Sequence, residues 1–232
     1  MDNRLLQLMS RSDYDALRPH LEHVTLEGGF IFAEPQQPIT EMHFLESGVA
    51  SVVAVGAKGP EVEVGIFGRE GILPTGAFPG LNCIPFKASL QIGGGSWRIA
   101  KAKLDEVCAN RASLRNLLLA WAHCFGVQAG YSARSNAIHP IAQRLARSLL
   151  MYDDRCQGDL PLTHEFLSKR LAVRRSTITT SLHELEGARL IRSERSCITV
   201  RDRRGLLAFA GEAYGAPEAE YERLLGPLWA VE

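Results

Sequence analysis

The 232-residue sequence contains no long apolar run, no apolar leader and no excess of charge of either sign. No stretch approaches the 18 apolar residues that a membrane-spanning helix needs. Met1 is followed by Asp2, Asn3 and Arg4, so a secretory signal is not expected. The five cysteines, at positions 83, 108, 124, 156 and 197, are scattered and odd in number, which argues against a disulfide framework. We therefore expect a cytoplasmic protein.

Motifs of the common enzyme classes are also missing. The sequence has no Gly-x-Ser-x-Gly nucleophile turn, no His-Glu-x-x-His metal motif and no phosphate-binding P-loop. We therefore assign no catalytic residue and no metal ligand, expect no cofactor, and do not expect an enzyme.

The zero net charge hides an uneven distribution. Residues 143–204 carry 13 Lys and Arg against 8 Asp and Glu, whereas residues 1–142 carry 12 against 13 and residues 205–232 carry 1 against 5. A basic excess confined to one segment is typical of a nucleic-acid-binding module, because it supplies the salt-dependent attraction to phosphates. The alternative is a charged surface patch unrelated to nucleic acid.

The first half of the chain has the pattern of a β domain. Short apolar runs are separated by Gly, Pro and acidic turns at regular spacing, as in a sandwich or barrel, and a jelly roll is the natural closure. A helical segment over residues 5–21 precedes them. The predicted strands are residues 30–32, 44–45, 49–55, 62–67, 86–92 and 97–99.

A long helix is predicted to begin at Lys103 or Leu104 and to continue to about Ser135. Its apolar stripe is too long to be covered by one small β domain, so it either pairs with the same helix of a second copy or packs inside the monomer. Pro140 cannot continue a helix without strain, so residues 136–140 are expected to form a hinge. The stripe consists of Leu104, Val107, Leu114, Leu117, Leu118, Trp121, Phe125, Gln128 and Ser132.

Two short helices and a hairpin are predicted between residues 162 and 200. Thr163 is placed to cap the first helix, and a tight turn at Ala172 and Val173 follows it. The second helix is opened by residues 174–177 and has an apolar face that we expect to point into the core. The residues of that face are Ile178, Leu182 and Leu185.

The opposite face of the second helix carries hydrogen-bonding side chains at the end that a recognition helix inserts into the major groove. The hairpin has strands at residues 190–191 and 198–200 and a turn at residues 193–197, and its arginines are within reach of phosphates. Together these elements predict a winged helix-turn-helix; the alternative is a helical hairpin with a solvated charged face. The candidate DNA-binding residues are Arg174, Arg175, Ser176, Thr177, Thr179, Thr180, Arg192 and Arg195.

This segment resembles the DNA-binding half of the Crp/Fnr family of bacterial transcription regulators. Upstream, residues 42–52 are similar to the family's strand, turn and strand around a glycine. Gly68, Arg69, Glu70 and Gly71 resemble the turn of its effector pocket. The likeness extends from about residue 5 to about residue 207, and two motifs in the right order support it more strongly than either alone.

The resemblance implies an α+β fold in four segments. These are a cyclic-nucleotide-binding-like β jelly roll over residues 1–102, a dimerisation helix over 103–137, a winged helix-turn-helix domain over 138–210 and a C-terminal tail over 211–232. It also implies a homodimer on double-stranded DNA, with a near-palindromic operator and recognition helices about 34 Å apart. Contact with RNA polymerase, and a two-state change passed from the roll through the helix to the hinge, are further expectations.

The resemblance to the Crp/Fnr family also implies roles for residues of the recognition helix. Arg175 is expected to bind a guanine, and Ser176 and Thr180 to contact bases or phosphates. Arg174 and Arg192 are expected to anchor the DNA backbone. Family receptors have Glu and Arg at the positions that match Ser176 and Thr180, so a different operator is expected.

The expected effector pocket comprises Gly68, Glu70, Gly71, Phe86 and Lys87. Cyclic-nucleotide receptors of the family hold the phosphate with an arginine followed by Ser or Thr, because a guanidinium binds two phosphate oxygens. Here Phe86 and Lys87 stand at that place, and a lysine supplies only a point charge. A small-molecule effector other than cyclic AMP is therefore expected, if there is one.

Other sensing chemistries depend on cysteine and histidine. No cysteine precedes Cys83, which disfavours an iron–sulfur cluster of the Fnr kind. Haem ligation by His43 or Cys83, and a redox switch through Cys83, Cys108 or Cys124, stay open. So do two alternative functions, a regulator without an effector and a β-roll interaction module that does not bind DNA.

Overall fold

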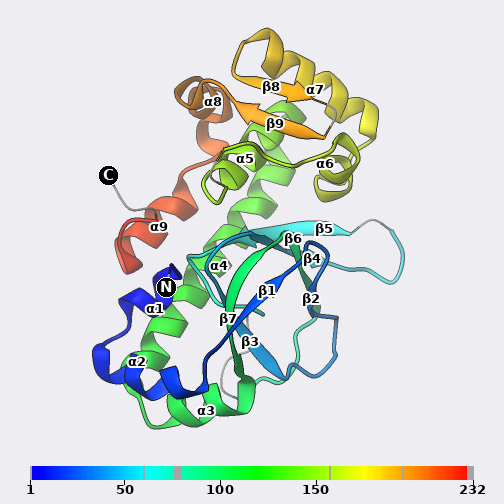
Figure 1. Cartoon of the computed structure of the whole chain (residues 1–232). Coiled ribbons are helices and arrows are strands. Elements are labelled where there is room, and N and C mark those ends of the chain that lie inside the picture. Colours follow the sequence, from blue (N-terminus) through cyan, green and yellow to red (C-terminus); the bar gives the residue numbers. More distant parts are fainter. Residues whose placement is uncertain (1, 60, 76–79, 157, 195, 229–232) are drawn as a thin grey trace.

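The computed structural model describes residues 2–59, 61–75, 80–156, 158–194 and 196–228. It shows a β domain, a mainly helical domain with a small hairpin, and a long helix, α4 (Ala112–Ile138), that runs along the first toward the second (Figure 1). We call the β domain the roll and the mainly helical domain with the hairpin the upper domain. The arrangement of jelly roll, long helix and winged helix-turn-helix confirms the predicted fold class.

The N-terminal segment is helical, as predicted, but it is divided. It comprises α1 (Arg4–Leu8), α2 (Arg11–Leu17) and a 3-10 turn, η1 (Arg18–His20). Asn3 caps α1 by accepting from the backbone N–H of Leu6 at 3.1 Å, and Ser10 caps α2 by accepting from that of Asp13 at 3.1 Å. The two caps therefore set where each helix starts.

Two antiparallel sheets form the roll, in the orders β1-β7-β3 and β2-β6-β4-β5. All six predicted strands are present, and the additional strand is β1, which lies at a sheet edge and pairs Glu22 with Arg98 of β7. Only Leu26 of β1 is buried, so the alternation that marks a strand is weak there. The strands are β1 (Glu22–Leu26), β2 (Ile31–Ala33), β3 (Glu41–Leu45), β4 (Val49–Ala54), β5 (Val62–Phe67), β6 (Phe86–Ile92) and β7 (Gly94–Ala100).

The turn between β3 and β4 depends on Gly48. Its φ of 85° lies in the left-handed region, and a Cβ atom there would come 2.4 Å from the carbonyl oxygen of Ile92. This is the glycine around which the strand, turn and strand were predicted, and the structure confirms that local pattern.

The predicted long helix is broken near its start. Helix α3 (Lys101–Ala109) ends at Asn110, Arg111 is extended, and α4 then begins at Ala112. The Arg111 guanidinium donates to a carboxylate oxygen of Asp13 at 3.3 Å, and the Ser113 hydroxyl donates to the other at 2.6 Å. These bonds hold the chain against α2. The prediction of one continuous helix was therefore wrong, because a contact with a segment distant in sequence interrupts the helix.

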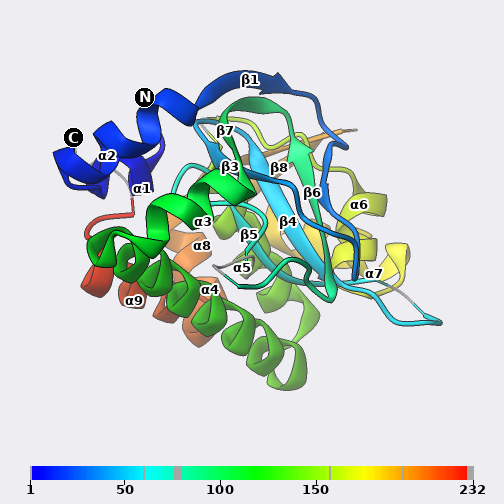
Figure 2. The ribbon, with the colours of Figure 1, turned by 90° about the horizontal axis from the view of Figure 1, so that it is seen from below.

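The apolar stripe of α4 is covered within the chain. Leu114, Leu118 and Trp121 are 0, 2 and 2% exposed. They pack in the core of the roll, and helix α9 (Ala216–Leu225) lies alongside α4, as Figure 2 shows from below. Of the two alternatives, packing inside the monomer is therefore correct for this stripe, which is not available to pair with a second copy.

The upper domain begins after a clear break. Helix α4 ends at Ile138, His139 is extended with ψ of 142°, and α5 begins directly after Pro140, as expected for a residue that precedes proline. The remaining elements are α5 (Ile141–Asp153), α6 (His164–Arg170), α7 (Arg175–Gly187), β8 (Ile191–Glu194), β9 (Cys197–Val200), α8 (Arg203–Ala210) and η2 (Gly211–Ala213), followed by α9. None of the helices in the described part of the chain is both long and apolar enough to cross a membrane.

The roll and the upper domain share a hydrophobic contact. Val49 of β4 and Ile66 of β5, at 0 and 1% exposed, belong to the same buried cluster as Leu149 of α5 and Leu167 of α6. The outer surface of the β4-β5 pair is therefore covered by the upper domain, which fixes the position of α6.

Gly71 provides a test of the packing between roll and α4. A Cβ atom at Gly71 would lie 2.2 Å from Cζ2 of the buried Trp121 ring. We expect Gly71→Ala to lower the free energy of unfolding by about 1–3 kcal/mol, because the ring must move within a close-packed core. Urea unfolding measures this change, with Gly187→Ala as control, since a Cβ at Gly187 meets nothing. Equal unfolding midpoints for Gly71→Ala and wild type would contradict the contact.

Candidate nucleic-acid interface

Helix α6 begins where Thr163 caps it. The Thr163 hydroxyl accepts a hydrogen bond from the backbone N–H of Phe166 at 3.1 Å. Glu165 lies in the first turn and Lys169 and Arg170 in the last, charges that suit the helix dipole. The predicted cap at Thr163 is confirmed.

The turn from α6 to α7 is tight because Ala172 takes a left-handed conformation, with φ of 52°. The backbone N–H of Val173 donates to the carbonyl of Ser168 at 3.0 Å and closes the turn. Glycine is the usual residue in this conformation, since a Cβ atom is strained there. The turn sets the angle at which α7 leaves α6.

Helix α7 has the predicted core face. Ile178, Leu182 and Leu185 are 0, 1 and 0% exposed, which confirms that they point into the upper core. The helix starts one residue later than predicted, at Arg175, because Arg174 is extended and forms the N-cap. The opposite side of α7 is consequently turned toward solvent.

Four candidate DNA-binding residues are exposed at the start of α7, and two are half-buried. Among the described residues, the guanidinium groups of Arg174 and Arg175 have no ion-pair partner, so both are free for an external acceptor. The exposed residues are Arg174, Arg175, Ser176 and Thr180, and the half-buried ones are Thr177 and Thr179.

The two outer threonines of α7 differ in their contacts. Thr180 donates to the carbonyl of Ser176 at 3.1 Å and stays exposed. Thr179 donates to the carbonyl of Arg175 at 3.2 Å and lies 3.1 Å from Nδ1 of His164. Both hydroxyls donate within α7, but the oxygen of Thr179 also contacts His164, whereas the exposed oxygen of Thr180 can still accept a hydrogen bond from outside.

The hairpin forms the wing beside α7. Strands β8 and β9 pair in antiparallel register, from Ile191 with Val200 to Glu194 with Cys197. Both strands extend further than predicted, so the predicted turn over residues 193–197 was too long, because the strand pairing continues to Glu194 and Cys197. The Arg192 side chain is 59% exposed and pairs with Glu194. Arg195 lies outside the described residues.

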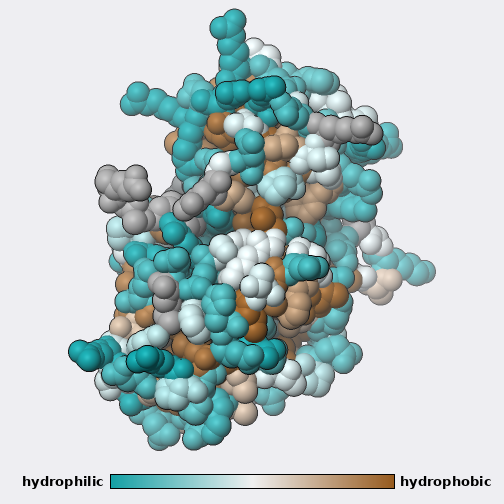
Figure 3. All heavy atoms as spheres, in the orientation of Figure 1, coloured by the Kyte–Doolittle hydropathy of each residue, from teal (hydrophilic) through white to brown (hydrophobic). Residues whose placement is uncertain are grey.

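An open groove of about 480 Å³ separates α7 from the wing, and Arg175, His183 and Ser193 contribute to its lining. Hydrophilic side chains project from the top of the upper domain around these elements (Figure 3). The geometry therefore offers a helix N-terminus with two unpaired arginines next to a β-ribbon, which is the shape that a major groove and its flanking phosphates accommodate.

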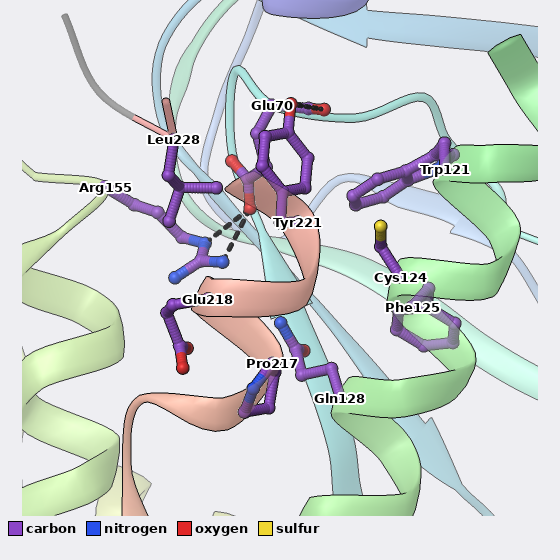
Figure 4. Close-up of a pocket in the computed structure, with 10 residues that line it drawn as sticks. All are labelled: Glu70, Trp121, Cys124, Phe125, Gln128, Arg155, Pro217, Glu218, Tyr221 and Leu228. Atoms are coloured by element: carbon purple, nitrogen blue, oxygen red, sulfur yellow. Dashed lines mark hydrogen bonds and ion pairs between the residues drawn. The ribbon is translucent and has the colours of Figure 1, made fainter. Parts of the chain in front are cut away.

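The turn that resembles the family's effector pocket is closed in this structure. Glu70, 1% exposed, accepts from the Arg155 guanidinium at 2.8 Å from Nε and forms an ion pair at 2.6 Å with its Nη2. Its second oxygen accepts from the backbone N–H of Gly68 at 2.8 Å, and its carbonyl accepts from the Tyr221 hydroxyl at 3.0 Å. Arg155 follows α5 and Tyr221 belongs to α9, so two distant segments meet at this turn (Figure 4).

Large side chains of α4 fill the space beside that turn. Trp121 lies over Gly71 and donates from its indole nitrogen to the carbonyl of Ile72 at 3.3 Å. Gln128 accepts from the backbone N–H of Ile66 at 2.8 Å. The cavity that they leave, with Phe125 and Tyr221 also lining it, holds about 20 Å³, which is room for one water molecule.

Phe86 and Lys87 do not join the Glu70 turn. Phe86 of β6 pairs with Ala54 of β4, whereas Phe67, which lies beside the Glu70 turn, pairs with Ala50 of β4. Phe86 is therefore four residues along β4 from the position beside the turn. The ammonium of Lys87 instead lies 3.6 Å from a carboxylate oxygen of Glu34. Sequence reasoning also missed Arg155, Trp121, Gln128 and Tyr221 as neighbours of Glu70. Trp121 and Gln128 were marked by the stripe of α4, but nothing local pointed to Arg155 or Tyr221.

The cysteines of the roll and α4 differ in reactivity. Cys83 is exposed. Burial raises the pKa of both the Cys108 and the Cys124 thiol to about 11, so neither is a ready thiolate at neutral pH. In the described part of the chain, no group of three or more His, Cys, Asp or Glu side chains is arranged to hold a metal ion.

The sequence profile of the Crp-like helix-turn-helix domain matches residues 143–209, the segment that carries α6, α7 and the wing. Residues 143–209 form a Crp-like helix-turn-helix domain. This bears out the resemblance drawn from the sequence.

Solved structures of several transcription regulators share the fold of most of the chain. FixK2 from Bradyrhizobium japonicum gives a TM-score of 0.71 at 14% identity, over 84% of this chain and 99% of that one. A CRP-family transcriptional regulator from Thermus thermophilus gives 0.68 at 15%, over 84% and 99%. The c-di-GMP responsive global regulator CLP of Xanthomonas campestris gives 0.66 at 14%, over 82% and 99%. The comparison with curated proteins gives no match.

The half-buried Glu63 of β5, whose side chain is 13% exposed, lies where the roll meets this Crp-like domain. It accepts from the Ser51 hydroxyl at 2.6 Å and from Tyr152 of α5 at 3.5 Å, and Nε of Arg170 in α6 lies 4.0 Å away. Burial raises the pKa of the Glu63 carboxyl above its ordinary 4.5, and Ser51 and Arg170 oppose that shift only in part. This carboxyl therefore makes the domain contact sensitive to pH.

We expect Glu63→Gln to reduce the pH dependence of stability. A carboxyl whose pKa is raised on folding stabilises most below its ordinary pKa, and that contribution is lost as the pH rises through the raised value. The free energy of unfolding of Glu63→Gln relative to wild type should therefore be higher at pH 8 than at pH 5, by urea unfolding. Glu61→Gln, at a more exposed site on the same side of the roll, is the control. An equal difference at both pH values would contradict the assignment.

Proposed function

We propose that the chain is a homodimeric transcription regulator that binds a specific, near-palindromic DNA operator. The observation that carries the proposal is the start of α7, where Arg174, Arg175 and Ser176 are exposed beside the wing and the two arginines have no partner among the described residues. Unpaired arginines at the N-terminus of a recognition helix suit guanine and phosphate contacts. The interaction-module alternative gives these groups no role.

Within this proposal the side chains have distinct tasks. Arg175 binds the O6 and N7 acceptors of a guanine with its planar guanidinium. Ser176 and Thr180 contact neighbouring bases or phosphates, and Arg174 and Arg192 bind the backbone on either side. Thr179 supports the helix from within, since its hydroxyl is bonded both to the carbonyl of Arg175 and to His164.

The second copy binds the exposed side of α4. This side carries Leu119, 51% exposed, and the open positions Gly126, Gly130 and Ala133, which follow each other at helical spacing. Small residues allow two helices to approach closely, and a Cβ at Gly126 or Gly130 meets nothing in the monomer. Two copies joined here would place their recognition helices one turn of DNA apart, about 34 Å.

The roll does not take a cyclic nucleotide in this proposal. The carboxylate of Glu70 is bonded to Arg155, and Trp121 and Gln128 fill the space that a ligand between roll and α4 would need. Neither Phe86 nor Lys87 supplies the paired donors that a phosphate needs at that turn. The closed turn favours a regulator whose DNA affinity does not require cyclic AMP.

Arg175→Ala tests the assignment of base recognition. From a library of random DNA, we expect wild type to select two half-sites one turn apart and Arg175→Ala to lose preference for one guanine per half-site, by roughly tenfold or more. Arg174→Ala is the matched comparison. It should weaken binding to all sequences alike and reduce the salt slope of log K by about 0.9 for each phosphate that is no longer neutralised. Unchanged base preferences in Arg175→Ala would show that the guanine assignment is wrong.

Gly126→Arg tests the dimer. A charged side chain at this open position of α4 should separate the two copies, so light scattering after size exclusion should give the monomer mass and operator affinity should fall. Ala102→Arg adds the same charge at an exposed site on α3 and should leave the dimer intact. A dimer mass for Gly126→Arg would place the interface elsewhere.

A further inference from the structure

His164 lies at the meeting point of α6, α7 and the wing. It is the first residue of α6 and is half-buried. Its Nδ1 is 3.1 Å from the hydroxyl of Thr179 in α7, and its Nε2 is 3.3 Å from the hydroxyl of Ser193 in β8. One imidazole thus contacts both elements that the proposed function places on DNA.

The hydrogen-bond directions follow from counting protons. The Thr179 hydroxyl has one proton, which it donates to the carbonyl of Arg175, so its oxygen accepts from His164 Nδ1–H. The Nε2 atom of the neutral ring then carries a lone pair and accepts from the Ser193 hydroxyl. Both ring nitrogens are therefore used, one for each element.

A second contact fastens the wing to α7. The backbone N–H of Ser193 donates to the carboxylate of Glu186 at 2.7 Å. The wing is thereby held near the C-terminal end of α7 by Glu186 and near the first helix by His164. The residues held, Thr179 and Ser193, are one turn from Arg175 and adjacent to Arg192 respectively.

We propose that His164 is a positioning residue that joins the recognition helix and the wing into one DNA-binding unit. This inference rests on the proposed function. It means that phosphate contact by Arg192 and base contact by Arg175 are coupled, because the ring fixes the spacing between the two elements. His164 itself need not touch DNA.

A double-mutant cycle on the full-length protein measures how far the contribution of Arg192 depends on each contact of His164. Arg192→Ala is made in wild type and in three variants at residue 164, and affinity for the operator that wild type selects is measured. His164→Asn retains a donor near the Nδ1 position and so the Thr179 contact. His164→Gln reaches the Nε2 position and so keeps the Ser193 contact.

We expect Arg192→Ala to lower operator affinity about tenfold in wild type and in His164→Gln. In His164→Ala and His164→Asn the Ser193 hydroxyl loses its partner and only the bond from its backbone N–H to Glu186 still ties Ser193 to α7, so the same substitution should lower affinity less than twofold. His164→Ala should also flatten the base preferences at the half-site, which His164→Asn should restore. Glu165→Gln, at the exposed next residue of α6, is the control and should behave as wild type.

Two failures are distinguishable. If wild type selects an operator but Arg192→Ala lowers affinity equally in all backgrounds, the wing and α7 act independently and the positioning role of His164 is overturned. If wild type selects no operator at all, the proposed function is wrong, and this inference falls with it.

Discussion

The ion pair between Glu70 and Arg155 fixes how the roll and the upper domain meet. Taking two charges out of water is costly unless each is fully bonded. Here Glu70 also accepts from Gly68, and Arg155 also donates to the carbonyl of Met151. Removing either partner would leave a buried charge, whose cost is about 3–5 kcal/mol. The pair therefore specifies one arrangement of roll, α5 and α9, and the position of α7 depends on it.

The elements that the sequence predicted well are those decided by neighbours along the chain. Thr163, the spacing of Ile178 and Leu182, and Pro140 act within a few residues, so the helix-turn-helix and the break after α4 were predictable. The break before α4 was not, because Arg111 and Asp13 meet only after folding. The stripe of α4 was correctly found to be apolar, but periodicity does not reveal which surface covers it. The contacts of Glu70 were not predicted for the same reason, since Arg155 and Tyr221 are far from it in sequence.

The contact between the domains combines an apolar and a polar part. Val49 and Ile66 extend the upper core onto the roll, while Glu63 binds Tyr152 and lies near Arg170 at its edge. Arg170 also donates to the side chain of Gln91 in β6 at 2.9 Å. Any reorientation of α7 relative to the roll must therefore break these bonds together with the apolar contact, so the two domains move only as a concerted step.

The distribution of the thiols has a practical consequence. Burial raises the pKa of Cys108, Cys124 and Cys156 to about 11, so their thiolate fractions at neutral pH are roughly a hundredfold below that of a thiol at its ordinary value. Cys83 alone among the five is exposed, at the start of the segment that leads into β6. Cys197 of β9 is half-buried, and burial raises the pKa of its thiol as well. An alkylating fluorophore would thus attach to the native protein fastest at Cys83 on the roll. Cys83 is thus a native site for a fluorescent label, and it is far in sequence from α7, the helix that is proposed to bind DNA.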